Sequence, residues 1–476
     1  MFSTLESLTT PLRTEIGVGC NEAMTMNRRR FLKTGFEITI DSLFAEALIA
    51  GAEPEHSGKP VSPISANDRI QFALIGAGGQ GQGDARIVQR VPGVRLVAVA
   101  DCYDGRLAHC REIWGNDIFT TRNYHEILSR SDVDAVIIAT PDHWHKQAAV
   151  DAMNAGKDVY LEKPMIHLYS DGPEIIQTAL KTKRILQVGS QRVSSVLYKK
   201  AKSLVAAGAI GKISVINAWW DRNPDYPVAA FVGSIPPDAS IETIDWLRFL
   251  GSAPKEPFNA EHFFQWRKWK AFGSGVAGDL FVHLFSGTHF IMDSHGPTKA
   301  VAMGGIRHWK DGRDQPDVLL GLFDFPQGFN LHVRVNFVSG ARESEGFQFV
   351  GSEGTMQVSG QSVVIRRSAH PIKPDYNIGS WSESTQSKFL SKFQQQYPAI
   401  PPHDELAIEG EEYAVPSGYS DSYDHLRNFC ESVRSRRPAV EDAVFGFRAA
   451  GAALLANESY EKGTIIRWDP TAMRIQ

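Results

Sequence analysis

Short apolar runs alternate with more polar, helix-like stretches through the first part of the chain. Runs of four to seven mostly apolar residues lie at 70–75, 94–100, 135–139, 158–161 and 185–188. Continuous apolar runs of this length are typical of parallel strands that are buried on both faces. Their alternation with helical stretches predicts a doubly wound parallel sheet of the α/β class over residues 67–190.

The pattern changes beyond about residue 210, where longer apolar–polar alternations are joined by glycine turns. The expected strands are 212–220, 318–325, 330–337, 347–350 and 355–358. They predict a C-terminal α+β domain over 191–420, with an open, largely antiparallel or mixed sheet. Residues 421–476 contain helical stretches, which we expect to pack back on the core. A segment rich in Pro and Trp (223–275) has little periodicity and is expected to be a functional loop.

A glycine motif follows the first strand. Gly76, Gly78 and Gly81 have the Gly-x-Gly-x-x-Gly spacing of a dinucleotide-binding turn, with Gly79 and Gln80 inside it. The glycines permit a tight turn, close approach of a pyrophosphate and close packing of strand and helix. The next helix would direct free N–H groups at the phosphates. The motif therefore predicts a Rossmann domain, while an ordinary glycine-rich turn is the alternative.

Asp101 lies at the carboxyl end of the second expected strand, 20 residues after Gly81. A carboxylate at this place accepts hydrogen bonds from ribose hydroxyls and repels a 2′-phosphate, so NAD is favoured over NADP. The alternative is that Asp101 only caps the next turn.

Two further groups have residue types suited to hydride-transfer chemistry. Glu162, Lys163 and Pro164 directly follow the strand 158–161, so Lys163 is expected at the cofactor crevice. Asp279 and His283 are four residues apart, which places them on one face of a helix. A histidine oriented by a carboxylate is a suitable general base for an alcohol. Solvated charges at a strand end and a buried His–Asp pair are the structural alternatives.

Together these residues resemble the Gfo/Idh/MocA oxidoreductase family, and the resemblance runs from about residue 69 to residue 470. It implies that Lys163, Asp279 and His283 form the catalytic group. The other positions that it implies near the cofactor are Thr140, Pro141, His145, Glu162 and Gln191. Many members carry a second acid three residues after the histidine, where this chain has Ser286. Substrate contacts on that side therefore differ from the family pattern.

The chain is most similar to a twin-arginine-exported branch of this family, in and around which some glycosidases use NAD without net redox change. The aromatic faces of Trp220 and Trp266 suit the C–H surfaces of a sugar, and Arg222 and Arg267 suit hydroxyls or an acid group. Packing in the core is the alternative for each tryptophan.

The bulk composition excludes several classes of function. The net charge of −4 gives no reason to expect nucleic acid or an anionic membrane as a partner. No stretch approaches the roughly 20 apolar residues that span a bilayer. The four cysteines lack Cys-x-x-Cys spacing, and His143 and His145 fit no zinc pattern. We therefore predict no metal, a small-molecule substrate and a homo-oligomer formed through the C-terminal sheet.

The N-terminus resembles a twin-arginine export signal at residues 27–33, although Glu37, Asp41 and Glu46 interrupt the apolar region that should follow. We expect a leader over 1–52, a linker over 53–66 and a periplasmic location. An inert tail on a cytoplasmic enzyme is the alternative.

These features predict an enzyme that oxidises a hydroxyl of a sugar or glycoside by hydride transfer to NAD, which either dissociates or stays tightly bound. The alternatives are a redox-neutral glycosidase that oxidises, eliminates and re-reduces, and a non-catalytic sensor that binds NAD.

Overall fold

The computed structural model describes residues 69–222, 231–340, 342–367, 376–397 and 409–476. The leader expected over 1–52 and the linker expected over 53–66 lie outside these residues. Within the described part of the chain, no helix is long and apolar enough to cross a membrane.

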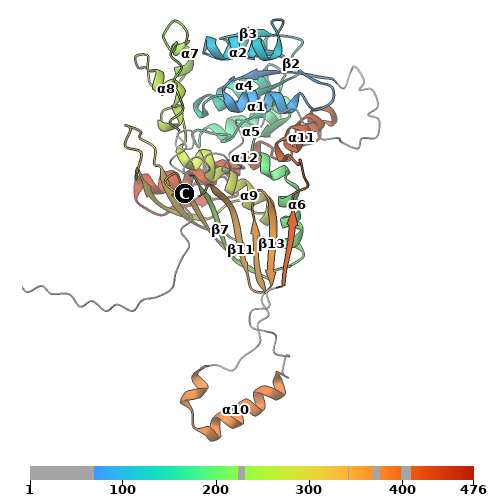
Figure 1. Cartoon of the computed structure of the whole chain (residues 1–476), viewed down its shortest axis with the longest axis vertical. Helices are drawn as coiled ribbons and strands as arrows, with labels where there is room; N and C mark the ends of the chain where they lie inside the picture. The colour runs from blue at the N-terminus through green and yellow to red at the C-terminus, as the bar shows by residue number, and fades with distance from the viewer. Residues whose placement is uncertain (1–68, 223–230, 341, 368–375, 398–408) are drawn as a thin grey trace, which may run out of the picture. The chain divides into compact units, whose positions relative to one another are not determined.

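The first sheet is parallel and has six strands in the order β3-β2-β1-β4-β5-β6. Figure 1 labels its strands β2 and β3 near the top of the molecule. Every residue of β4 and β5 is buried, which explains their unbroken apolar runs. The strands are β1 (Ile70–Ile75), β2 (Val94–Ala100), β3 (Phe119–Thr121), β4 (Ala135–Ile138), β5 (Asp158–Leu161) and β6 (Leu186–Val188). The helices that connect them are α1 (Gly79–Val88), α2 (Asp104–Trp114), α3 (Tyr124–Leu128), α4 (His145–Asn154) and α5 (Asp171–Thr182).

The strand order reverses between β1 and β4, and this reversal fixes where a ligand can bind. In doubly wound sheets the crevice lies beyond the carboxyl ends of the strands at such a switch point. The predicted parallel sheet is confirmed, and the glycine motif lies at its switch point, directly after β1.

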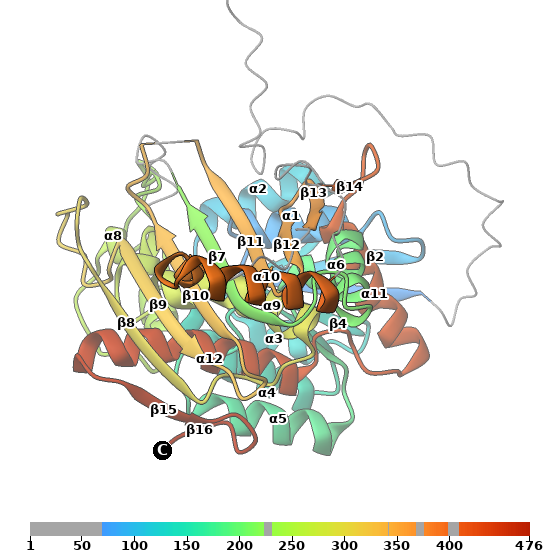
Figure 2. The same cartoon turned by 90° about the horizontal axis from the view of Figure 1, so that it is seen from below.

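The second sheet has ten strands in the order β14-β13-β12-β11-β7-β10-β9-β8-β15-β16, and part of it is seen side by side in Figure 2. Among the described strand pairs of this second sheet, only β7 and β10 are parallel, so the expected mixed sheet is confirmed. Five strands that the sequence analysis expected are β7 (Ile213–Asp221), β9 (Val318–Asp324), β10 (Asn330–Asn336), β11 (Ser344–Gly351) and β12 (Gly354–Val358). Strands that it missed are β8 (Lys299–Gly305), β13 (Ser362–Arg367), β14 (Glu409–Ala414), β15 (Ile466–Asp469) and β16 (Arg474–Ile475).

Helices cover one face of this mixed sheet. Strand β10 alternates buried and partly exposed residues, as expected when only one face is packed. The helices beside the sheet are η3 (Gln191–Ser194), α6 (Val196–Ala206), the π-helical turn η6 (Ala277–Phe281), α9 (Val282–Met292), α11 (Asp421–Ser435) and α12 (Ala443–Lys462). Helix α12 packs on β8 and α9, whereas Leu426, Phe429 and Cys430 of α11 belong to the core of the parallel sheet. The C-terminal helices therefore contact both sheets.

The segment rich in Pro and Trp has more structure than its sequence suggested. From residue 231 it forms α7 (Trp246–Leu250), α8 (Ala260–Phe264) and the short 3₁₀ helix η5 (Trp266–Lys268). Trp246, Phe249, Phe263 and Phe272 form a separate aromatic core with Tyr103. Helices of five residues are too short to show a 3.6-residue period, so their apolar pattern did not predict them. The chain also forms η7 (Tyr376–Ser380) and α10 (Glu383–Gln396), in which no residue is buried.

Candidate active site

The glycine turn after β1 has a backbone that only glycine tolerates. Gly76 has a φ of +94°, and a Cβ at this position would lie 2.5 Å from the carbonyl oxygen of Ala139. A Cβ on Gly81 would lie 2.1 Å from the carbonyl oxygen of Gly76. Gly78 is the N-cap of α1 and no side chain caps this helix start. The first turn of α1 is therefore suited to an anionic group, as the motif predicted.

Asp101 lies at the end of β2, beside this turn. Its carboxylate accepts hydrogen bonds from the N–H groups of Ala77 (2.8 Å) and Tyr103 (2.9 Å), and Arg106 lies 3.5 Å away. Tyr103 is the N-cap of α2, so Asp101 also ties down the next turn. The two N–H groups occupy one lone-pair site on each carboxylate oxygen, and a ribose hydroxyl would take the place of a long Arg106 contact at 3.5 Å.

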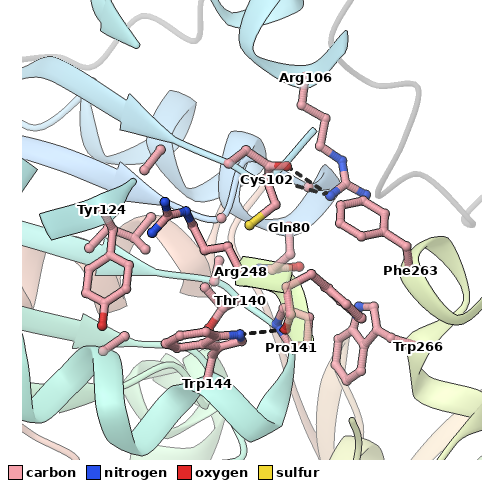
Figure 3. A pocket seen from close by; sticks show the side chains of 18 of the residues that line it. Gln80, Cys102, Arg106, Tyr124, Thr140, Pro141, Trp144, Arg248, Phe263 and Trp266 are labelled. Atoms are coloured by element: carbon pink, nitrogen blue, oxygen red, sulfur yellow. Dashed lines mark hydrogen bonds and ion pairs between the residues drawn. The ribbon is translucent and has the colours of Figure 1, made fainter. Parts of the chain in front are cut away.

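A pocket lies at the switch point between these loops (Figure 3). The expected cofactor residues that line it are Gly76, Gly78, Gly79, Gln80, Asp101, Thr140 and Pro141. His145 does not face the pocket: it is buried, and its ring lies between the carbonyl oxygens of Pro164 (2.6 Å) and Thr140 (3.0 Å). His145 therefore connects the loop after β4 to the loop after β5. Gly81 does not line the pocket either, and its role is the close packing of α1 on Gly76. These residues fit a dinucleotide, because the glycine turn leaves room that any Cβ would fill.

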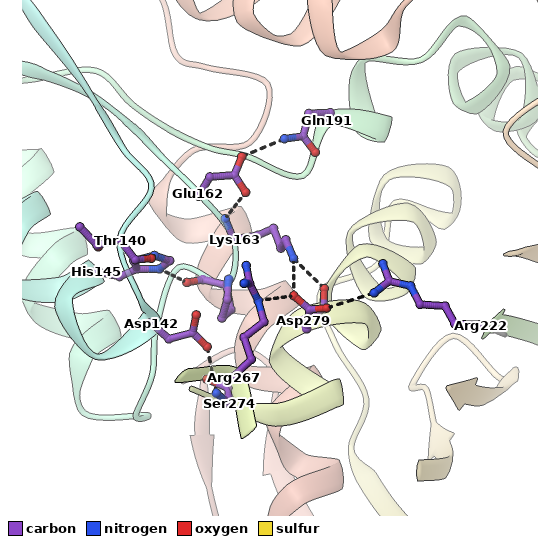
Figure 4. A network of polar contacts seen from close by, with 11 residues as sticks. Thr140, Asp142, His145, Glu162, Lys163, Gln191, Arg222, Arg267, Ser274 and Asp279 are labelled. Atoms are coloured by element: carbon purple, nitrogen blue, oxygen red, sulfur yellow. Dashed lines mark hydrogen bonds and ion pairs between the residues drawn. The ribbon is translucent and has the colours of Figure 1, made fainter. Parts of the chain in front are cut away.

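Lys163 and Asp279 form the centre of the polar network (Figure 4). Lys163 Nζ lies 2.9 Å from Asp279 Oδ1 and donates to the Asp279 carbonyl oxygen at 2.9 Å. Arg267 Nε lies 3.3 Å from the same carboxylate and Arg222 lies 4.0 Å from it. Burial alone would raise the pKa of Asp279, but the charges of these three cations outweigh it and lower this pKa. Asp279 is therefore an anion held by three cations.

His283 lies near this network, but the structure does not show Asp279 orienting it. The expected pairing assumed an α-helix, whereas Asp279 lies in the π-helical turn η6 and His283 in the first turn of α9. A π turn bonds residues five apart, so residues four apart no longer share one face. Within the described chain His283 Nδ1 is enclosed without a hydrogen-bond partner, and the ring packs 5.6 Å from Trp220. Burial, then Lys163, lowers the pKa of His283 well below its usual value, so the ring is neutral at pH 7.

Two buried carboxyls, those of Glu162 and Asp84, lie near Lys163. Glu162 accepts a hydrogen bond from Gln191 Nε2 at 2.8 Å, so Gln191 holds this carboxyl. Asp84 of α1 neighbours Glu162, and burial followed by the charge of Glu162 raises the pKa of Asp84. Burial also raises the pKa of Glu162, although Lys163 opposes this. Asp84 was missed because a polar residue in a helix after a glycine motif carries no distinguishing signal.

Glu441 explains the departure from the family pattern at Ser286. Ser286 is buried, and its hydroxyl contacts Glu441 Oε1 at 3.0 Å and Ser190 Oγ at 3.1 Å. A carboxyl from the segment before α12 thus lies beside position 286. Burial raises the pKa of Glu441 to about 8. The two residues are 155 positions apart in sequence, so no local pattern links them.

The four residues expected to bind substrate fall into two groups. Trp220 is the second-last residue of β7 and lies beside His283. Arg222 directly follows β7 and pairs with Glu343 at 3.4 Å. Trp266 and Arg267 instead line the pocket formed with the glycine turn, and Arg267 reaches from there to Asp279.

The two histidines weighed as metal ligands have other partners. His143 Nε2 contacts the Phe249 carbonyl oxygen at 2.8 Å, and both ring nitrogens of His145 contact carbonyl oxygens. Among the residues that the structure describes, no three His, Cys, Asp or Glu side chains are grouped so as to hold a metal ion.

A doubly wound sheet with a glycine turn at its switch point, joined to a mixed sheet, is the architecture of a dinucleotide-dependent oxidoreductase. Residues 70–190 match the model of the oxidoreductase family with an NAD-binding Rossmann fold, and residues 198–357 match the model of the GFO/IDH/MocA C-terminal domain. The chain belongs to the Gfo/Idh/MocA oxidoreductase family.

Several characterised proteins are similar in part. The scyllo-inositol 2-dehydrogenase (NAD(+)) of Bacillus subtilis is 29% identical over 50% of this chain and 75% of its own length. A 2,7-anhydro-N-acetylneuraminate hydratase of Mediterraneibacter gnavus is 31% identical over 33% of this chain and 41% of its own length. A glycosyl hydrolase family 109 protein of Shewanella sp. (strain ANA-3) is 31% identical over 33% of this chain and 38% of its own length. The chain thus spans less than half of the last two relatives.

The fold also matches solved structures. A levoglucosan dehydrogenase in complex with NADH and levoglucosan has a TM-score of 0.61, at 16% identity, over 84% of this chain and 99% of its own. A probable dehydrogenase from Thermotoga maritima has a TM-score of 0.57, at 18% identity, over 85% of this chain and 100% of its own. At this identity the likeness concerns the fold.

The buried carboxyl of Glu441 gives a prediction on stability. Its pKa of about 8 in the native state exceeds the reference value of 4.5, so the native state binds more protons between these values. Stability from this group is therefore present below pH 4.5 and is lost as the pH rises through 8. Glu441→Gln should reduce the loss of unfolding free energy between pH 5 and pH 9 by up to about 4 kcal/mol.

Urea denaturation at the two pH values measures this difference. Glu353→Gln, at an exposed glutamate, is the matched control and should follow the wild type. Parallel pH profiles for Glu441→Gln and the wild type would contradict the assignment.

Proposed function

We propose that this protein oxidises a hydroxyl of a sugar or glycoside with NAD, using Lys163 and His283. The observation that carries the proposal is the Lys163–Asp279 pair at 2.9 Å, at the carboxyl end of β5 and linked through Arg267 to the dinucleotide pocket. The sugar-related relatives and the NADH-bound structural neighbour support it.

The charges around the pocket favour NAD over NADP. Arg106, Arg122 and Arg248 line it, and each already has an acidic partner: Asp101, Asp104 and Asp245 respectively. None of these arginines is therefore left to neutralise an extra 2′-phosphate, and Asp101 would repel one.

Lys163 and His283 have different roles in the proposed reaction. Bound NAD supplies the hydride acceptor. Lys163, positioned by Asp279, donates a hydrogen bond to the substrate oxygen and stabilises negative charge that develops there. His283, neutral because of its burial, takes the hydroxyl proton at Nε2, since Nδ1 is enclosed. The hydroxyl oxygen loses this proton and the carbon that bears it loses hydride to NAD, which gives a ketone and NADH.

The aromatic wall near His283 suits a sugar ring. Trp220 packs against His283, and the guanidinium of Arg192 lies 5.5 Å from the centre of its ring. A tryptophan face packs well on the axial C–H groups of a pyranose, and the nearby Arg222 suits hydroxyl or carboxylate groups.

Lys163→Met should reduce kcat by roughly 10²- to 10⁴-fold, because the substrate oxygen loses its cationic donor. NAD affinity should change by less than about threefold, since Lys163 is not among the residues that line the pocket. Asp279 would still be held by Arg222 and Arg267, so the fold should persist. Steady-state kinetics on a sugar that reduces bound NAD, together with NAD titration, measures both quantities.

Lys388→Met, at an exposed lysine of α10, is the control and should behave as the wild type. A Lys163→Met variant with wild-type turnover would exclude this catalytic role. A wild-type protein that binds NAD but turns over no sugar would instead favour a binding protein.

A redox-neutral glycosidase is the second candidate, favoured by the relatives named as a glycosyl hydrolase and an anhydrosugar hydratase. Here the ketone acidifies the neighbouring C–H, the aglycone is eliminated, water adds, and hydride returns to the same carbon.

The two candidates differ in the fate of the nucleotide. During turnover in D₂O, the redox-neutral route should place deuterium on the carbon beside the oxidised one while absorbance at 340 nm stays constant. A net dehydrogenase should accumulate one NADH for each ketone released. Deuterium analysis by NMR with simultaneous absorbance measurement decides between them.

We also propose that the residues resembling a twin-arginine signal direct the protein to the periplasm. A redox-neutral cycle would suit that location, because it consumes no free nucleotide.

The uncovered face of the mixed sheet supports our proposal of a homo-oligomer. Met303 of β8 and Leu322 of β9 are 76% and 55% exposed on neighbouring strands. Apolar residues clustered in this way commonly mark a protein interface. Glu substitutions at both positions should convert the oligomer to monomers in analytical ultracentrifugation without loss of secondary structure. Leu180→Glu on α5 is the control, and a wild-type chain that is already monomeric would overturn the proposal.

A further inference from the structure

The part of the Pro- and Trp-rich segment that the structure describes, residues 231–273, is here called the cover segment. One side of it is joined to the loop after β2. Asp104 N–H donates to the Thr243 carbonyl oxygen at 3.0 Å, and Asp245 N–H donates to the Cys102 carbonyl oxygen at 2.8 Å. These bonds and the bridge between Tyr103 and Ile244 attach it as a short strand would attach.

The other side of the cover segment is joined to the loop after β4. The carbonyl oxygen of Phe249 receives Trp144 Nε1–H at 2.8 Å and contacts His143 Nε2 at the same distance. The His143 N–H donates to the Phe272 carbonyl oxygen at 3.2 Å. Strands β2 and β4 flank β1 in the sheet, so the cover segment is anchored on both sides of the glycine turn.

Between these anchors the cover segment presents aromatic and cationic side chains to the pocket. Phe249, Phe263, Phe264 and Trp266 all line it together with the glycine turn. Figure 3 shows Phe263 and Trp266 on the opposite side from Thr140. The guanidinium of Arg106 lies 5.4 Å from the ring centres of both Phe263 and Phe264. Arg106 also contacts Asp101. An aromatic and guanidinium surface therefore lies directly beside the carboxylate expected to bind ribose.

This surface has the chemistry that recognises a nucleobase. Flat aromatic faces and guanidinium planes stack on bases, whatever the identity of the base. Asp101 marks the adenosine end of the site, because it ends β2. Arg267, at the other end of the cover segment, reaches Asp279 and so marks the catalytic end.

We propose that the cover segment is the second wall of the dinucleotide site, with Phe264 and Arg106 holding the adenine half, and that it retains the nucleotide between turnovers. The inference rests on the proposed use of NAD. Release of the nucleotide requires the cover segment to detach from the loops after β2 and β4. Phe263 is buried in the aromatic core of the segment and supports Phe264.

Phe264→Ala tests the wall, because this ring is only partly buried and its loss leaves the aromatic core in place. The full-length variant should bind ADP-ribose about tenfold more weakly or worse, and should release NAD correspondingly faster. Its affinity for nicotinamide mononucleotide should match the wild type. Titration calorimetry with each compound and stopped-flow displacement of NAD measure these values.

Phe389→Ala is the matched control, since this ring is also half-buried on a helix but lies on α10, outside the pocket. Wild-type affinity and release rate in Phe264→Ala would overturn the inference while leaving the use of NAD intact. A wild-type protein that binds neither NAD nor ADP-ribose would overturn the proposed function and this inference together.

Hydrogen exchange of the wild type provides a measurement that needs no variant. The amides of Asp104, Asp245 and His143 form the bonds that anchor the cover segment. NAD should slow their exchange at least tenfold, because a nucleotide beneath the segment opposes its opening. Unchanged exchange at these amides with NAD bound would also overturn the inference.

Discussion

The ion pair between Lys163 and Asp279 is the interaction on which the site depends. It joins the carboxyl end of a strand in the parallel sheet to the π-helical turn that precedes α9 beside the mixed sheet. Both side chains are largely buried, so the attraction must offset the loss of hydration of two charges. Such pairs are weak sources of stability, and their value here is to fix an ammonium group at the edge of the dinucleotide pocket.

The buried carboxyls of the site have pKa values that are shifted in opposite directions by their surroundings. Asp279 lies among Lys163, Arg222 and Arg267, whose charges lower its pKa, whereas burial raises the pKa of Glu162 and that of Glu441. Carboxyls whose environments move their pKa values apart are typical of sites that must hold a charge in one place and avoid it in another. Here the Asp279 anion faces its three cations, whereas the Glu162 carboxyl is held by Gln191 and the Glu441 carboxyl by Ser286.

The sequence predicted those features that depend on local rules. Buried parallel strands produced the apolar runs, and Gly76 and Gly81 were identifiable because close backbone approach forbids a Cβ. Lys163 was located because it follows a strand. Features that depend on contacts distant in sequence gave no signal: Glu441 meets Ser286 only in the fold, and a π turn moved His283 out of register with Asp279. The cover segment was read as irregular because its helices are too short to show a period.

The anchoring of the cover segment links the architecture to the choice between the two reactions. A dehydrogenase that exchanges NADH for NAD in every cycle would have to break the contacts to the loops after β2 and β4 each time. A redox-neutral enzyme returns the hydride before product leaves and has no need to open that side of the pocket. Trp266 and Arg267 lie where the cover segment meets the catalytic network, so opening it would also disturb Asp279. If the cover segment retains the nucleotide as we propose, its anchoring favours chemistry in which the nucleotide stays.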